Sequence, residues 1–259
     1  MRTGLLVSEF RKVFTLNFWW ALLIAPLVVG MFASAIYAAI ADGLGAYDSG
    51  ANDNDGLSTG LASAGLYFAL VWVVLFAGIF GAINAGTDFR HKTITPTLLV
   101  TPRRDPVVAT KLLVTVVVAL GYVLVVEAAS LACLAVFGGG SIRWGLMLLG
   151  VLATGIAATV CWALIGAGLG LLLGSPVGAA LLLVSWYVVG EITVALILTG
   201  IGLDGLAVWL PGAATLGTVA IRSTDDFLLT WPVAPLVLLA WTALFAGGGW
   251  WLTRRRDIT

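Results

Sequence analysis

Apolar positions along the chain gather into six long stretches separated by short polar segments. A helix needs about 20 mostly apolar residues to cross a bilayer, and each stretch reaches that length. Backbone groups in lipid must be hydrogen-bonded within the segment, so the stretches are expected to be helices. The pattern predicts an all-α polytopic membrane protein, a single transmembrane domain over residues 1–259. The six predicted spans cover approximately residues 17–41, 61–83, 112–137, 144–173, 178–200 and 230–252.

The segment before the first span, residues 3–16, has a helical period of its own. Its apolar and polar side chains fall on opposite faces of a helix, which is typical of a helix lying in the membrane interface. We therefore expect an N-terminal interfacial amphipathic helix. The apolar face holds Leu5, Leu6, Phe10, Val13 and Phe14, and the polar face holds Ser8, Glu9, Arg11 and Lys12.

Two further segments carry turn and capping signals. Ser175 followed by Pro176 predicts an N-cap and first helical residue at the start of the fifth span. Residues 201–230 are long and mixed, and Pro211-Gly212 divides two apolar pieces that are each too short to span.

Composition agrees with a membrane protein and gives its orientation. Hydrophobic residues make up 61% of the chain and charged residues 10%, whereas soluble domains are near half and a quarter. Of the 13 Lys and Arg, all but Arg143 and Arg222 fall on the side of the two termini. Because cytoplasmic loops carry the excess of Lys and Arg, we expect a multi-pass protein of the cell membrane with both termini cytoplasmic.

The sequence contains few residues or motifs that are typical of a catalytic site. His91 is the one histidine, no P-loop motif occurs, and Cys133 and Cys161 lie inside spans as expected buried thiols. An intramembrane protease would need a Ser–His, paired-Asp or metal constellation, which the spans do not offer. The sequence predicts no catalytic site, no metal, no cofactor of its own and no nucleic-acid partner.

The most charged segment, residues 84–111, separates the second and third spans on the terminal side. Thr95-Pro96 predicts a helix start and Thr101-Pro102 a helix stop, so a short helix is expected near 95–101. One interpretation is an interfacial helix with a topology-setting charge cluster. The other is a docking element for a soluble partner.

The stretch from Asp88-Phe89-Arg90-His91 to Leu98-Leu99-Val100-Thr101-Pro102-Arg103-Arg104 resembles the first cytoplasmic loop of ABC-2-type permeases, the transmembrane subunits of ABC exporters. The resemblance, which covers nearly the whole chain, implies a pair of permease subunits, homomeric or heteromeric, with two cytoplasmic ATPase subunits that bind ATP-Mg. It implies that residues 84–111 hold the coupling helix and that residues 201–230 form short re-entrant helices near the outer face. The expected contacts with the ATPase are Asp88, Phe89, Arg90, His91, Thr95, Leu98, Leu99 and Arg103.

The apolar path suits export of an amphipathic drug, peptide antibiotic or lipid. Two acids, Glu127 and Glu191, lie inside predicted spans. An ionised group there costs about 3 kcal/mol or more, so each must face protein or water. They could line the substrate path or form a protonation-sensitive gate, or they could form interhelical hydrogen bonds, with Ser130, Ser185 and Thr193 as candidate partners. The alternative function is an autonomous ion-coupled transporter or channel that uses both acids.

Small residues form a face on the fourth span, at Gly166, Gly168, Gly170 and Gly174. Such faces let helices approach closely. We expect this face to serve packing within the subunit, with contact between subunits as the alternative.

Overall fold

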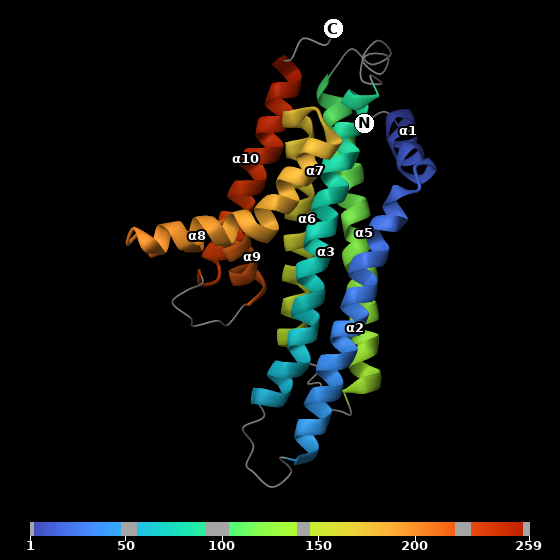
Figure 1. Cartoon of the computed structure of the whole chain (residues 1–259). Helices are drawn as coiled ribbons and strands as arrows, with labels where there is room; N and C mark the ends of the chain where they lie inside the picture. Colours follow the sequence, from blue (N-terminus) through green and yellow to red (C-terminus); the bar gives the residue numbers. More distant parts are fainter. Residues whose placement is uncertain (1–2, 48–55, 92–103, 139–145, 221–228, 256–259) are drawn as a thin grey trace.

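The structure is a computed structural model that describes residues 3–47, 56–91, 104–138, 146–220 and 229–255. Its described part is helical, and six helices are long and apolar enough to cross a membrane, which confirms that prediction. The long helices lie side by side, with both termini at one end of the bundle (Figure 1). The elements are α1 (Thr3–Thr15), α2 (Phe18–Tyr47), α3 (Gly56–Arg90), α5 (Arg104–Phe137), α6 (Leu146–Leu173), α7 (Pro176–Ser185), a π-helical turn (Trp186–Gly190), α8 (Glu191–Gly200), a 3-10 helix (Asp204–Trp209), α9 (Pro211–Val219) and α10 (Val233–Arg255).

Helix α6 lies between α3 and α10, and glycines allow both close approaches. A Cβ at Gly166 would stand 1.9 Å from the carbonyl oxygen of Gly78 on α3. A Cβ at Gly168 would stand 2.3 Å from the carbonyl oxygen of Phe245 on α10. The prediction that the glycine face serves packing within the subunit is confirmed for these two positions. Gly166 packs against α3, and Gly168 packs against α10.

The polar segment between the second and third spans is shorter than predicted. Helix α3 continues to Arg90 and α5 starts at Arg104, so much of residues 84–111 is helical. The difference arises because both helices extend past their apolar stretches, so that part of the charged segment lies on helix ends. Residues 92–103, including the helix expected near 95–101, lie outside the described residues.

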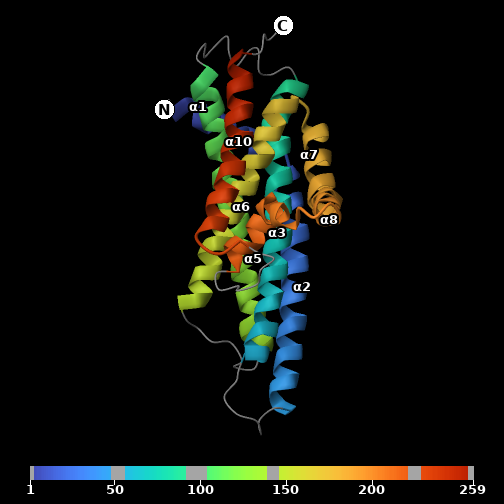
Figure 2. The same cartoon turned by 90° about the vertical axis from the view of Figure 1, so that its left-hand side faces the viewer.

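The fifth predicted span, residues 178–200, is not one straight helix. Ser175 caps α7 by accepting from the Gly178 amide at 3.2 Å, and Pro176 starts the helix, as predicted. After the π-helical turn at Trp186–Gly190, α8 leaves the bundle crosswise (Figure 1) and is seen nearly end-on in Figure 2. None of its residues is buried. A π-turn inserts an extra residue into the helical repeat, which redirects the faces that follow it.

The segment after α8 forms two short helices, as the break at Pro211 predicts. The 3-10 helix ends at Trp209, and α9 begins at Pro211. Helix α9 packs against α6 and α10, and Trp162 of α6 donates a 2.8 Å hydrogen bond to the hydroxyl of Thr215 on α9. The segment is therefore fixed to the bundle by both packing and a buried polar contact.

A candidate functional site at the terminal end of the bundle

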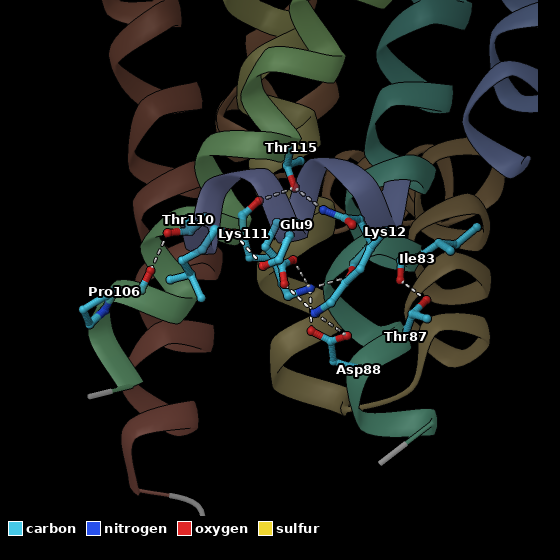
Figure 3. Close-up of polar contacts among 12 residues, drawn as sticks. Glu9, Lys12, Ile83, Thr87, Asp88, Pro106, Thr110, Lys111 and Thr115 are labelled. Carbon is cyan, nitrogen blue, oxygen red and sulfur yellow. Dashed lines mark hydrogen bonds and ion pairs between the residues drawn. The ribbon is translucent and has the colours of Figure 1, made fainter. Parts of the chain in front are cut away.

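Four charged side chains from three helices meet at the end of the bundle that carries the termini (Figure 3). Glu9 and Lys12 come from α1, Asp88 from α3 and Lys111 from α5. The Lys111 ammonium lies 2.7 Å from Asp88 Oδ2 and 3.0 Å from Glu9 Oε2. The Lys12 ammonium lies 2.5 Å from Glu9 Oε1 and 3.5 Å from Asp88 Oδ1. We call these four residues the charge cluster.

Three members of the charge cluster are buried: Glu9 is 1% exposed, Lys111 4% and Asp88 6%. Removing charges from water is costly unless each one is paired and hydrogen-bonded. Here two carboxylates face two ammonium groups, so the cluster is neutral as a whole. Lys111 also donates to the carbonyl oxygen of Asn84 at 3.2 Å. Separating any of the three helices would leave a buried charge without its partner.

The cluster corrects the orientation expected for α1. The helix is present, and Val13 of its apolar face is buried in the core of the bundle. Glu9, however, was placed on the outward polar face, and it is buried against α5. Glu9 is buried because it pairs with Lys111 of α5. The periodicity of residues 3–16 contains no information about that partner.

A second polar contact lies one helical turn from the cluster. The Asn84 side-chain amide donates to the Thr115 hydroxyl at 3.0 Å, and Thr115 donates to the carbonyl oxygen of Lys111. Asn84 precedes Asp88 by four residues on α3, and Thr115 follows Lys111 by four on α5. Residues four apart share a helix face, so the two helices are joined at two consecutive levels.

A cavity of about 180 Å³ adjoins the charge cluster. It brings Asp88 and His91, two of the predicted coupling residues, to one site beside Lys12 and Lys111. His91 directly precedes the undescribed segment 92–103. The complete lining is Lys12, Leu16, Phe18, Asn84, Thr87, Asp88, His91 and Lys111.

The other predicted coupling residues divide into two groups. Phe89 is partly buried and packs beside Val108 of α5, and Arg90 is exposed at the end of α3. Thr95, Leu98, Leu99 and Arg103 lie outside the described residues.

Polar contacts also fasten the start of α5 to the end of α10. Arg104 donates to the carbonyl oxygens of Thr253 and Arg254, at 3.0 and 3.1 Å. Trp250 donates from its indole nitrogen to Asp105 Oδ1 at 2.8 Å, and Arg254 lies 3.2 Å from the same oxygen. Arginine donors at the last carbonyls of a helix satisfy groups that have no partner within it. Both flanks of segment 92–103 are therefore anchored. The end of α3 is held in the charge cluster through Asp88. The start of α5 is held in the same cluster through Lys111 and on α10 through Arg104 and Asp105.

Glu191, a predicted member of the substrate path, binds the start of α9. Its two carboxylate oxygens accept the backbone amides of Gly212 at 2.8 Å and Ala213 at 2.6 Å. A carboxylate at a helix N-terminus satisfies unpaired amides and faces the positive end of the helix dipole. Thr193, one expected partner, instead donates to the Val189 carbonyl of its own helix. The observed contact is a structural bridge between the α7–α8 bend and α9.

Glu127, the second predicted member of that path, is buried inside the bundle on α5 at 4% exposure. Its Oε1 atom has no hydrogen-bond partner among the described residues, and neither does the Ser130 hydroxyl. The expected Glu127–Ser130 hydrogen bond is therefore not formed. A Cβ at Gly155 of α6 would stand 2.8 Å from Glu127 Oε1, so the glycine makes room for the carboxyl group.

Sequence reasoning found Asp88 but missed the roles of Glu9 and Lys111. One usable signal was the charge of Lys111 inside a stretch that continues as a helix, since a buried lysine needs an acid nearby.

Comparison with known proteins adds no relative: a scan against protein-family models finds no matching family, and a search of curated proteins finds no match.

Proposed function

We propose that the chain is the transmembrane permease subunit of an ATP-driven exporter of the ABC-2 type, coupled to a separate cytoplasmic ATPase. Its cargo would be an amphipathic molecule such as a drug, a peptide antibiotic or a lipid. The permease would work in pairs and leave ATP binding to the partner subunits. Six apolar helices, both termini at one end and the concentration of Lys and Arg on that side support this assignment.

The observation that carries the proposal is the anchoring of segment 92–103. Residues before it belong to α3 and include Asp88, and residues after it belong to α5 and include Lys111. These two residues pair at 2.7 Å and also hold Glu9 and Lys12 of α1. A soluble subunit that pushes on segment 92–103 would therefore move α1, α3 and α5 together. This is the mechanical property that a coupling element needs.

The contacts of Glu191 weaken the case for the alternative, an ion-coupled transporter. That carboxylate is engaged by two backbone amides of α9, which gives it a structural role without any transported ion. Glu127 alone would have to carry the coupling.

The proposal can be tested by co-expressing the chain with the ATPase subunit encoded beside it. We expect the two to purify as a complex whose ATP hydrolysis responds to amphipathic compounds. A double substitution, Leu98→Asp with Leu99→Asp, should abolish co-purification and lower hydrolysis at least tenfold. Its matched control is Thr15→Asp with Asn17→Asp, which adds the same charge at exposed positions of the same end and should leave the complex intact.

Two results would contradict the proposal. One is an intact, fully active complex with the Leu98 and Leu99 substitutions. The other is flux of ions or substrate through vesicles that contain the chain alone, abolished by Glu127→Gln, which would favour the autonomous transporter.

A further inference from the structure

An apolar cavity of about 270 Å³ lies where α7 bends into α8. Its lining residues come from α6, α7, the π-helical turn, α9 and α10. None of its lining residues is charged. The complete lining is Trp162, Ile165, Leu169, Leu182, Leu183, Trp186, Pro211, Trp241 and Phe245.

The polar groups of two lining tryptophans are already used elsewhere. Trp162 donates its indole N–H to Thr215 at 2.8 Å, and Trp241 donates to the carbonyl oxygen of Trp209 at 2.9 Å. Trp241 and Phe245 lie nearly parallel, with ring centroids 5.9 Å apart, and form a flat aromatic wall. Trp186, the third lining tryptophan, has an indole N–H without a hydrogen-bond partner among the described residues. Apart from this N–H, the lining side chains offer carbon surface and no charge, so a hydrocarbon fits the cavity better than a charged headgroup.

Size and rim both suit a flexible chain. A dry apolar cavity of about 150 Å³ is enough to bind benzene, so this cavity has room for a longer hydrocarbon segment. Ile165, Leu169 and Leu183 make its depth and are buried. Leu182 at the rim is 48% exposed, which marks the open side.

The position of the cavity among the candidate membrane-spanning helices indicates which ligand it would bind. The cavity is framed by α6, the α7–α8 stretch and α10, three of the helices that are long and apolar enough to span a membrane. A cavity that opens beside such helices opens toward lipid tails, which are present there at high concentration. We propose that this cavity is a binding site for the acyl chain of a membrane lipid, seated against Trp241 and Phe245 at the α7–α8 bend.

Glu191 connects the site to the rest of the fold. The carboxylate follows the π-helical turn directly and holds the first turn of α9, whose Pro211 lines the cavity. An acyl chain in the cavity therefore packs between the bend and the helix that the bend fixes. The inference does not depend on the exporter assignment.

Photolabelling of the full chain in phosphatidylcholine vesicles tests the site. The probe is phosphatidylcholine with a diazirine at the end of one acyl chain, and labelled peptides are mapped by mass spectrometry. We expect peptides containing residues 162–169 and 241–245 to be labelled at least fivefold more than the exposed face of α2. The same diazirine placed in the headgroup should not label them.

Two neighbouring substitutions make the test specific. Leu182→Trp fills the rim and should lower labelling of the cavity peptides at least fivefold. Leu181→Trp adds the same bulk at a 63% exposed position that does not line the cavity, and should change labelling less than twofold. Leu169→Phe, at a buried lining position of α6, should reproduce the Leu182→Trp result.

The assignment is overturned if labelling is no higher in the cavity than on α2, as it would be if a second copy of the chain filled the space. It is also overturned if the headgroup probe labels the cavity equally well, or if Leu182→Trp and Leu181→Trp behave alike.

Discussion

At the scale of single residues, the charge cluster holds together helices that are far apart in the sequence. Glu9 and Lys111 are separated by about a hundred positions, and their contact is 3.0 Å long. The two lysines differ in environment, because the side chain of Lys111 is 5% exposed and that of Lys12 is 37% exposed. This difference predicts unequal contributions from two chemically identical groups.

We expect Lys111→Met to destabilise the chain by about 3 kcal/mol, because it leaves Glu9 and Asp88 as buried carboxylates with one shared lysine. Lys12→Met should cost less than about 1 kcal/mol, as for a partly exposed ion pair. Thermal unfolding in detergent would measure both. Equal losses for the two variants would show that burial does not set the strength of the cluster. Adding Glu9→Gln to Lys111→Met should recover part of the loss.

Glu191 gives a second prediction at this scale. Glu191→Ala removes the acceptor for the first amides of α9, and hydrogen bonds to charged groups contribute about 1.5–3 kcal/mol. Amide hydrogen exchange in residues 211–219 should therefore speed up at least tenfold. The control is Thr193→Val, whose hydroxyl bonds only within its own helix in the structure and should leave α9 protected. Unchanged exchange in Glu191→Ala would refute the capping role.

At the scale of elements, the approach of α3 to α6 depends on the absence of side chains. Gly166 and Gly78 bring the two backbones into contact, and Gly81 of α3 does the same against Ala163 of α6, where a Cβ would stand 2.0 Å from the carbonyl oxygen. In lipid, such close packing replaces the hydrophobic effect as a source of helix association.

Gly166→Ala should therefore push α3 and α6 apart and destabilise the bundle by about 1–3 kcal/mol or more. Gly121→Ala on α5 is the matched control, since its Cβ would meet nothing within 4 Å. There the gain in helix propensity, up to about 1 kcal/mol, should leave stability unchanged or raised. Folded yield and melting temperature in detergent compare the two. A Gly166→Ala variant as stable as Gly121→Ala would contradict the packing interpretation.

At the scale of the whole molecule, the even number of predicted spans returns the chain to the side where it began, and the structure has both termini at one end (Figure 1). The distribution of Lys and Arg predicts that this end is cytoplasmic.

Cysteine labelling in intact cells would test that orientation. In a background with Cys133→Ala and Cys161→Ala, Ser49→Cys should react with a membrane-impermeant maleimide added outside. Ile258→Cys should react only after the cells are opened. The reverse pattern, or labelling of both in intact cells, would refute the predicted topology.

The sequence alone determined the helical class, the number of apolar stretches, the cap at Ser175 and the break before Pro211. Each of these depends on local chemistry: an uninterrupted apolar run is long enough to span, and serine, proline and glycine act on their immediate neighbours. The same local reasoning assigns Glu9 to the polar face of its helix and treats residues 178–200 as one span, without the bend that the structure shows.

Only the tertiary structure decided where the acids go. Glu9 is buried because Lys111 lies opposite, and Glu191 binds α9 because the π-helical turn brings it to the helix start. Partners of this kind are set by the packing of distant helices, and no periodicity within one segment specifies them. A charged residue in an apolar helix predicts that a partner must lie nearby. Which residue is that partner depends on how the helices pack.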